Sequence, residues 1–483
     1  MKFSYIHKCV CRFIIFCTLA SLFISPLNIV SVIAGSPIII STDWSKVIST
    51  TNSESFGING QGAMVLDWGT NPQYIANLKN IQPQFVRFHD SIQQDSSKNW
   101  RAWANYQTKS WDKVKIREFA NMIRKWRANG IKSNIVITLS SYPNWFKKKQ
   151  IKNSQGVVVS EILDPSEYTG FGNLARDLVA IINKEENLNV TNFEIFNEFD
   201  YEYSIKPQDG GAPRQMQELG RLYNHISKSM KSADNRISTG GISFARTNRV
   251  EGIREFIETV APEKNPRTLD YLSYHQYMSG NAADSDTTIY NNAMMYPLWS
   301  SRDIKGLLDN NKLFIPIRFY EFNISWSGDS VEPRMINQKG AIFDALALVS
   351  AMKSGNISVA PWTDLDPRYG KMSQNYQLRP SAFVWKMLNS LPANLQIVNS
   401  KSTNPDIVTF ALKSPTTPKR YIFVINHGGV TQNINLGSFA GDAAIKISVL
   451  DESQNAIQTR TANGSTLINT SIARNSVNLF EIR

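Results

Sequence analysis

The feature that most constrains this chain is a regular alternation of two kinds of segment between about residues 50 and 395. Short runs rich in β-branched and aromatic residues predict strands, and the longer amphipathic stretches that follow them predict helices. The runs that could be strands are Phe56–Asn59, Phe85–Asp90, Ser133–Ser140, Asn192–Asn197, Arg236–Ile242, Tyr271–Tyr277, Ile315–Phe322 and Ser358–Thr363. Eight βα units predict an α/β fold with a parallel sheet, a (β/α)8 or TIM barrel.

The helical stretches carry start and stop signals. In Asp112–Ala128, Ile116, Phe119 and Ile123 fall near one face of a helix, and Gly130 follows as a stop. The other stretches of this kind are Tyr168–Asn183, Gln215–Met230, Gln338–Met352 and Arg379–Leu391.

Beyond Leu391 and Pro392 the sequence changes character, because short strands are now separated by Pro, Gly, Asn and Asp. This spacing predicts a C-terminal antiparallel β-sandwich. Its predicted strands are Gln396–Val398, Ile407–Leu412, Tyr421–Ile425, Ile445–Leu450 and Val477–Ile482. A strand within Pro37–Ser45 is expected to pair with the sandwich. The predicted domains are a joining segment at 35–50, the barrel at 51–395 and the sandwich at 396–483.

Residues 1–34 have the pattern of a secretory signal peptide. Lys2, Lys8 and Arg12 precede a mostly apolar stretch, and Ala34 is a small residue at the expected cleavage site. We therefore predict a secreted or periplasmic protein; the alternative is that the segment is kept as a membrane anchor. All three cysteines lie in this segment, so cleavage would leave no disulfide, thiolate nucleophile or cysteine–zinc site.

The composition, with 42% hydrophobic and 19% charged residues, is that of a folded protein. The net charge of +12 is typical of proteins with acidic partners, including nucleic acids. The basic residues are spread along the chain, however, and export favours a different partner. We expect an oligosaccharide or polysaccharide as the partner, with an anionic polysaccharide or a cell envelope fitting the charge, and no nucleic acid. A basic surface that serves only solubility is the alternative.

Two glutamates stand at predicted strand ends, where a (β/α)8 barrel builds its active site. Glu198 ends the fourth strand and Glu321 lies in the seventh, and apolar and aromatic residues precede both. Such surroundings raise the pKa of a carboxylic acid. Glycoside hydrolysis needs two facing carboxyl groups, one protonated and one ionised. Glu198 and Glu321 are therefore the candidate catalytic residues.

Short motifs at other strand ends accompany this pair. They read VRFH at 86–89, GG at 240–241, SYHQY at 273–277, YEFNIS at 320–325 and PWTD at 361–364. Together with the Asn-Glu of the fourth strand, their order resembles glycoside hydrolase family 39, the β-xylosidase and α-L-iduronidase family of retaining barrel glycosidases. The resemblance covers about residues 50–430.

The resemblance implies roles for the two carboxylates. Glu198 would act as general acid and then general base, and Glu321 would be the nucleophile that forms a glycosyl-enzyme. Asn197 would donate a hydrogen bond to the 2-hydroxyl group of the sugar.

Three further contacts are implied by the resemblance. His275 and Tyr277 would orient Glu321 and keep it ionised, and His89 would contact the sugar in the −1 subsite. Either histidine could instead be a satisfied core residue. No metal is expected, because the two histidines lack helical spacing and neighbouring cysteines, and no cofactor is expected.

The sequence also departs from the family pattern. Phe199 replaces a proline after Asn-Glu, Phe196 stands where tryptophan is common, and Tyr320 replaces a threonine. These changes spare both carboxylates but leave the substrate open between xylosides and a bacterial exopolysaccharide. The alternative function is a catalytically silent carbohydrate-binding protein of an exopolysaccharide system.

Aromatic side chains after the strands are candidate platforms for sugar rings, although core packing is the alternative. We expect Trp145, Trp326 and Trp362 to face the ligand. The lysines at 147–149 are expected to lie in a solvated loop, or else to contact acidic sugars.

Overall fold

The structure is a computed structural model that describes residues 36–64, 68–89, 103–203, 215–327, 332–437, 444–453, 456–464 and 469–483. The segment Pro37–Arg483 forms one unit by its internal contacts. The signal peptide predicted at 1–34, with its cysteines, and Asp90 of the second predicted strand lie outside the described residues.

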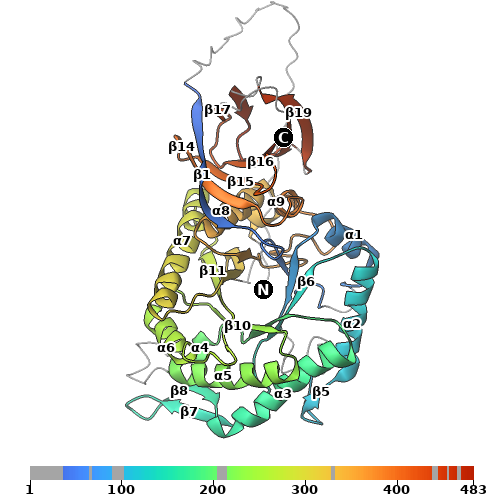
Figure 1. Ribbon diagram of the computed structural model, residues 1–483, viewed down its shortest axis with the longest axis vertical. Coiled ribbons are helices and arrows are strands. Elements are labelled where there is room, and N and C mark those ends of the chain that lie inside the picture. Colours follow the sequence, from blue (N-terminus) through green and yellow to red (C-terminus); the bar gives the residue numbers. More distant parts are fainter. Residues whose placement is uncertain are drawn as a thin grey trace, which may run out of the picture. The chain divides into compact units, whose positions relative to one another are not determined.

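Eight parallel strands form the predicted barrel (Figure 1). Phe56 and Val359 make a parallel bridge between the first and last strands, which brings the sheet close to closure. Each predicted run overlaps one strand, and β10, β11 and β12 extend two or three residues beyond theirs, so the predicted fold class is confirmed. In sheet order the strands are β13 (Ser358–Val359), β12 (Ile317–Ser325), β11 (Tyr271–Ser279), β10 (Ser238–Phe244), β9 (Asn192–Ile195), β6 (Asn134–Leu139), β3 (Phe85–Phe88) and β2 (Ile58–Asn59).

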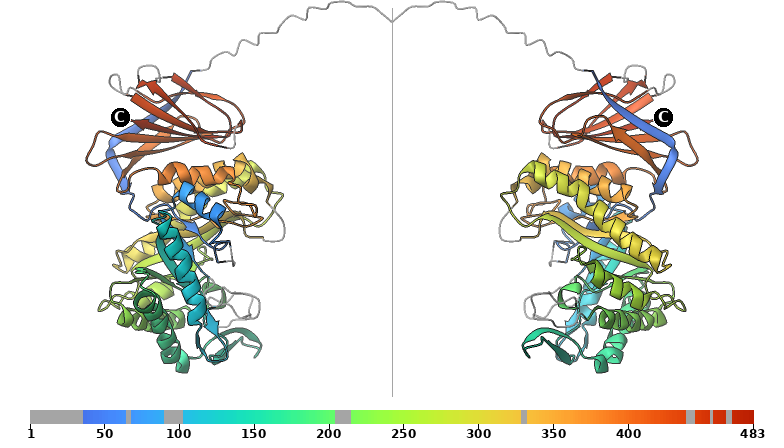
Figure 2. Two further views of the ribbon diagram at one scale, coloured as in Figure 1. Left: turned by 90° about the vertical axis from the view of Figure 1, so that its right-hand side faces the viewer. Right: turned by 90° about the vertical axis from the view of Figure 1, so that its left-hand side faces the viewer.

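Helices follow the strands and surround the barrel (Figures 1 and 2). In α2 the Asp112 side chain accepts the N–H groups of Val114 and Lys115, and Gly130 follows with φ +85°. The α-helices are α1 (Pro72–Ile81), α2 (Lys113–Ala128), α3 (Tyr168–Ala180), α4 (Asp200–Tyr203), α5 (Met216–Ala233), α6 (Val250–Val260), α7 (Asp286–Asn310), α8 (Gln338–Lys353) and α9 (Pro380–Asn389). Shorter turns are the 3-10 helices Pro165–Glu167 and Pro333–Ile336 and the π-helix Ile181–Glu185.

Two small antiparallel hairpins lie outside the barrel sheet. They are β4 (Ala104–Asn105) with β5 (Ser110–Trp111), and β7 (Lys148–Lys152) with β8 (Val158–Leu163). The second hairpin corrects the expectation that residues 147–149 form a loop, because Lys148 and Lys149 pair with Leu163 and Ile162. Lys147 forms an ion pair with Asp164 at 3.1 Å.

The inside of the barrel is apolar in one layer and charged in the next. Phe85, Val136, Tyr271, Tyr320 and Ala360 form an interior apolar cluster. In β3, Arg87 lies two positions beyond Phe85, so strand alternation places it on the same inward side. The next layer therefore carries a buried charge directly below the ends of the strands.

The C-terminal domain is one continuous nine-stranded sheet. Residues from both arms of this sheet, among them Ile422, Ile447, Ile434 and Ile472, share a single hydrophobic cluster, which makes the domain a sandwich. Its strands, in sheet order, are β19 (Gln458–Asn463), β18 (Ala444–Leu450), β21 (Ser476–Ile482), β16 (Arg420–Asn426), β15 (Ile407–Lys413), β14 (Gln396–Ser402), β1 (Ile38–Thr50), β17 (Gln432–Asn435) and β20 (Asn469–Ile472).

The sandwich is antiparallel except at one pair. Strand β1 is antiparallel to β14 but parallel to β17, so the expectation of a purely antiparallel domain is wrong there. Strands β17, β19 and β20 have no predicted counterpart, because their polar sequences lack an apolar alternation.

Helix α8 joins the barrel to the sandwich. Its residues are buried on nearly every side, as expected for a helix covered by two layers. The Gln338 side chain donates to the Leu450 carbonyl, and Lys353 donates to the carbonyls of Ser400 and Thr409. None of the helices that the structure describes has the length and apolarity needed to cross a bilayer.

Candidate active site

A pocket of about 1010 Å³ opens at the C-terminal ends of the barrel strands. It brings together residues that are far apart in the sequence, among them most of the predicted site residues. Those that line it are His89, Asn197, Glu198, His275, Tyr277, Glu321, Trp326 and Trp362. The remaining candidate, Trp145, lies elsewhere.

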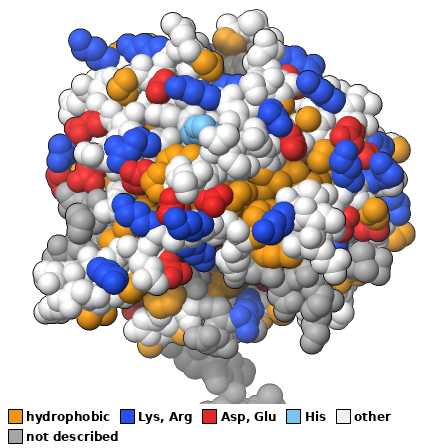
Figure 3. All heavy atoms as spheres, turned by 90° about the horizontal axis from the view of Figure 1, so that it is seen from below, with side chains coloured by type: hydrophobic (Ala, Val, Ile, Leu, Met, Phe, Trp, Pro, Cys, Tyr) orange, Lys and Arg blue, Asp and Glu red, His pale blue; other side chains and the backbone are white. Residues whose placement is uncertain are grey.

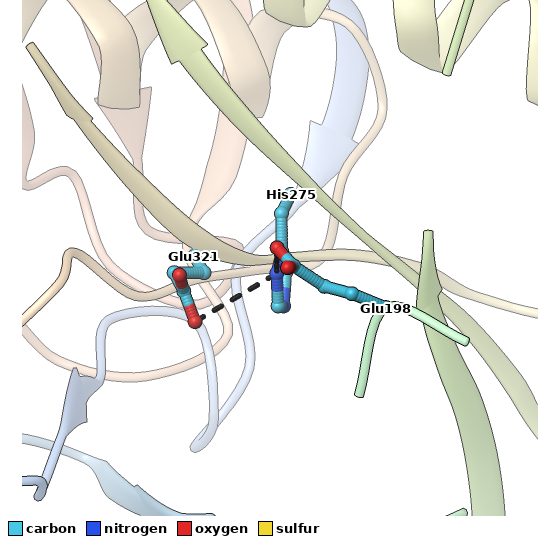
Figure 4. Close-up of side chains that lie close together, drawn as sticks. All are labelled: Glu198, His275 and Glu321. Carbon is cyan, nitrogen blue, oxygen red and sulfur yellow. Dashed lines mark hydrogen bonds and ion pairs between the residues drawn. The ribbon is translucent and has the colours of Figure 1, made fainter. Parts of the chain in front are cut away.

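The two glutamates face each other across this pocket (Figure 4). A carboxylate oxygen of Glu198 lies within 4.8 Å of one of Glu321. Retaining glycosidases keep their carboxyl groups about 5–5.5 Å apart, whereas inverting enzymes need about 6.5–9.5 Å. The spacing here is that of a retaining enzyme.

Local features of the backbone direct the side chains of Glu198 and Glu321 into the pocket. Glu198 has φ +60°, a left-handed conformation that is strained for a residue with a side chain, and its N–H donates to the Ile242 carbonyl. In β12 the register relative to β11 shifts by one residue between Phe319 and Glu321, so Tyr320 is the extra residue. This β-bulge lets Tyr320 fill the barrel while Glu321 lines the pocket.

Glu198 is the more exposed of the two glutamates, with 28% of its side chain accessible. Burial raises the pKa of its carboxyl group, although the positive charges of His89, Arg87 and Arg246 oppose the rise. His275 Nδ1 lies 2.8 Å from Glu198 Oε1, and burial lowers the pKa of His275 to about 4. The imidazole is therefore neutral near pH 7 and holds Glu198 by a hydrogen bond.

Glu321 is buried and surrounded by donors. Its Oε1 accepts a hydrogen bond from the Tyr277 hydroxyl at 2.6 Å, and burial raises the pKa of Tyr277 well above its usual range, so the phenol keeps its proton. Its Oε2 lies 3.5 Å from Arg87 Nη1 and 3.7 Å from His275 Nδ1. A phenol hydroxyl and a guanidinium therefore hold the Glu321 carboxyl group in place.

His275 and Tyr277, both expected to orient Glu321, differ in the glutamate that they contact most closely. Tyr277 contacts Glu321 as expected, whereas the shortest side-chain contact of His275 is to Glu198. His89 stacks on Trp362 with ring centroids 4.8 Å apart, and both line the pocket.

Arg87 organises the floor of the pocket, a role that sequence reasoning missed. Fully buried, it forms an ion pair with buried Glu194 at 2.6 Å and donates to Asn197 Oδ1 at 2.7 Å. Burial alone would raise the pKa of Glu194, but the charge and hydrogen bond of Arg87, the hydrogen bond from Ser273 and the nearby His275 together lower it below its ordinary value. The signal in the sequence was an arginine in an otherwise apolar strand, because a charge there requires a buried partner.

Trp145 does not face the active-site pocket, contrary to the expectation that it contacts the same ligand as Trp326 and Trp362. Its indole packs edge-on against Tyr106 and beside Phe146, and it lines a separate pocket of about 600 Å³ between the β5 and α3 segments. Trp326, in contrast, is 69% exposed at the active-site pocket.

The other aromatic residues after the strands also fall into two groups, those in the core and those at the active-site pocket. Tyr142 and Tyr203 are buried core residues, whereas Tyr201 is 49% exposed and lines the active-site pocket.

Glu198, His275 and Glu321 also satisfy the distance requirement for a cation site. Two features of the site oppose a metal there. His275 Nδ1 is already within hydrogen-bond distance of Glu198, and the buried Arg87 guanidinium lies 3.5 Å from Glu321. A second positive charge at this point would be repelled.

Charged side chains are interspersed on the face that Figure 3 shows, with Lys and Arg next to Asp and Glu. This face does not present the continuous basic surface that nucleic-acid binding uses.

A (β/α)8 barrel with facing glutamates after its fourth strand and in its seventh, at this short spacing, defines a retaining glycoside hydrolase. The profile described as "Glycosyl hydrolases family 39" matches residues 66–352, and the chain belongs to that family. The resemblance found in the strand-end motifs is thereby confirmed.

Solved structures agree with this fold over nearly the whole chain. A monomeric β-xylosidase from Caulobacter crescentus is 15% identical, with a TM-score of 0.59 over 92% of this chain and 99% of its own. A family 30 endoxylanase from Clostridium papyrosolvens is also 15% identical, with a TM-score of 0.61 over 93% and 100% of the two chains. A family 39 enzyme from Xanthomonas axonopodis pv. citri gives 15% identity and a TM-score of 0.59 over 95% and 99%. No curated protein shows significant sequence similarity to this chain.

Proposed function

We propose that this glycoside hydrolase cleaves β-glycosidic bonds of xylosides or of a bacterial exopolysaccharide, with Glu198 as acid/base and Glu321 as nucleophile. The assignment rests on one observation. A carboxylate oxygen of Glu198 lies within 4.8 Å of one of Glu321, and the two carboxyl groups have different surroundings. The pKa of Glu198 is raised by burial, whereas Glu321 is held by a phenol and a guanidinium.

The reaction proceeds in two displacements. The Glu321 carboxylate attacks the anomeric carbon while Glu198 transfers its proton to the leaving oxygen, which breaks the glycosidic bond. The Glu198 carboxylate then takes a proton from a water molecule, whose oxygen attacks the anomeric carbon and releases Glu321.

Asn197 is proposed to bind the 2-hydroxyl group of the sugar. Because its Oδ1 accepts from Arg87 Nη2, the amide nitrogen is turned toward the pocket as a donor. The stacked pair of His89 and Trp362 would support the sugar in the −1 subsite.

The nucleophile is identified by trapping. A 2-deoxy-2-fluoro glycosyl fluoride of whichever sugar is cleaved in an aryl glycoside screen should slow the second step and leave the sugar bound to the protein. Peptide mass spectrometry should find the label on Glu321, within β12 (Ile317–Ser325). A label on another carboxylate would overturn the assignment, and Glu321→Gln should incorporate none.

The acid/base role of Glu198 is tested with Glu198→Ala and a dinitrophenyl glycoside. This leaving group needs no protonation, so the first step should survive while the second becomes limiting. Azide, which needs no general base, should restore turnover and give a β-glycosyl azide. A variant that azide does not rescue would contradict the role.

We also propose that the protein is exported, which its predicted signal peptide supports. Expression of the full chain in a bacterial host, followed by fractionation and N-terminal sequencing, should give an extracytoplasmic protein that begins at Gly35. Retention of residues 1–34 on a membrane fraction would instead indicate an anchor.

A further inference from the structure

We propose that the pocket holds, on the leaving-group side of Glu198, a subsite for an acidic sugar, and that Arg246 binds the carboxylate of that sugar. The inference rests on the proposed role of Glu198, because the general acid must face the oxygen of the leaving group. It adds a substrate class, oligosaccharides with a uronic acid next to the cleaved bond.

The backbone ties Arg246 to the segment that carries Glu198. Arg246 follows the end of β10, and its N–H donates to the buried carboxylate of Asp200 at 2.8 Å. Ala245 donates to the same carboxylate at 3.1 Å. Asp200 begins α4, and the Tyr201 N–H donates to the Glu198 carbonyl. Arg246 and Tyr201 are thus held beside Glu198, and both line the pocket.

The Arg246 side chain is arranged to receive a planar anion. Its guanidinium lies 4.0 Å from the centroid of the Tyr201 ring, so the ring covers one planar face. The Nη1 atom is buried and has no hydrogen-bond acceptor within the part of the chain that the structure describes. Buried N–H groups are normally paired, so Arg246 has hydrogen-bonding capacity that the described residues leave unused.

The second arginine at the pocket provides a contrast. Arg302 on α7 is 68% exposed, and its Nε lies 3.1 Å from Asp303. Arg246 makes no ion pair of this kind among the described residues, although its charge lies near enough to Glu198, Asp200 and Glu202 to oppose the rise in pKa that burial gives each of them. A carboxylate pairs with the fork of a guanidinium through two parallel hydrogen bonds, which a neutral sugar cannot form. Exposed aromatic rings of Tyr201 and Trp299 on the same pocket provide faces for the sugar itself.

The test is a binding titration that needs no turnover. The probes are D-glucuronate and D-galacturonate, with D-glucose and D-galactose as neutral counterparts, each titrated into the Glu321→Gln protein by calorimetry or ligand-observed NMR. The uronates should bind more tightly than the neutral sugars. Adding Arg246→Met should weaken uronate binding by about tenfold or more, and Arg246→Lys should weaken it less.

Arg302→Met serves as the matched control and should bind the uronates as its parent does. Circular dichroism establishes that the Arg246 variants are folded. Equal binding of uronates and neutral sugars, or equal uronate binding by the Arg246→Met protein, would overturn the subsite.

The placement of the subsite has its own readout. The trapped fluoro-glycosyl enzyme should still bind glucuronate, because the covalent sugar fills only the −1 subsite; loss of binding would move the uronate to that position and overturn the proposal. Trapping and azide rescue test the catalytic roles, whereas the titrations test the subsite. Failure of the proposed catalytic roles can therefore be distinguished from failure of the proposed subsite.

Discussion

At the scale of single residues, the site places two identical side chains in different surroundings. Glu198 loses hydration and gains a neutral imidazole neighbour, whereas Glu321 gains a phenol donor and a nearby guanidinium. Burial in the first environment raises the pKa of Glu198, which favours its protonated form. The proposed role of Glu198 as the proton donor therefore rests on its environment and not on residue type.

The pH dependence of activity follows from the raised pKa of Glu198. A general acid works only while protonated, so kcat/KM should fall as pH rises through this pKa, at a pH above the ordinary range of glutamate. The pH profile of Glu198→Gln on the dinitrophenyl substrate should lack this alkaline limb. An unchanged limb in that variant would assign it to another group.

Arg87 connects the stability of the barrel to the geometry of the site. Replacing it with Met leaves Glu194 charged and buried, which should cost about 3–5 kcal/mol of unfolding free energy. The variant should also lose about 100-fold in kcat, because Asn197 and Glu321 lose a common anchor. Urea unfolding and steady-state kinetics measure the two effects.

The double variant Arg87→Met with Glu194→Gln is the control for Arg87. It should recover part of the stability, because no buried charge is left unpaired, but not the kcat. Recovery of both would mean that Arg87 contributes only to folding.

At the scale of elements, α8 stands between the two domains and carries a buried charge. The Asp344 carboxylate pairs with Lys371 Nζ at 2.6 Å and accepts from Trp385 Nε1 at 2.8 Å. Both partners of the ion pair are almost fully inaccessible to solvent. The pair links α8 to the segment after β13 and to α9.

Breaking this pair from one side should be more harmful than removing both charges. Lys371→Met should lower the unfolding free energy by about 3–5 kcal/mol, because Asp344 stays buried without its partner. Lys371→Met combined with Asp344→Asn, which keeps an acceptor for Trp385, should be less destabilised. Chemical denaturation checks the order, and a double variant worse than the single one would contradict it.

At the scale of the whole molecule, residues from the beginning of the described chain complete a domain built from its end. Strand β1 lies between β14 and β17 in the nine-stranded sheet, as Figure 1 shows. Ile40 of β1 belongs to the sandwich core. The strand therefore joins the two arms of the sandwich and leads directly into the barrel.

Deleting residues 36–50 should uncover the edges of β14 and β17 and leave Ile40's place in the core empty. Unpaired edges promote association between molecules, so we expect a lower apparent Tm and concentration-dependent aggregation. Differential scanning fluorimetry and light scattering measure both. A truncated protein as stable and monodisperse as the parent would show that β1 is dispensable.

Much of the architecture could be predicted because strand and helix periodicity is local. The eight barrel strands were found from apolar runs alone, whereas β19 was missed because its exposed edge position needs no apolar alternation. The position of Glu198 and Glu321 at the same end of the barrel followed from parallel strand order. Their separation and the Arg87 contacts did not, because these depend on side chains from several strands.

The amino-acid sequence by itself determined the (β/α)8 barrel, the sandwich and the end of the barrel at which the glutamates lie, since each follows from burial patterns within short segments. Only the tertiary structure decided that His275 contacts Glu198, that Trp145 lines another pocket and that the bulge at Tyr320 turns Glu321 inward. Burial on one face of a strand is encoded locally. The partner that a buried polar group finds depends on packing between segments far apart in the chain.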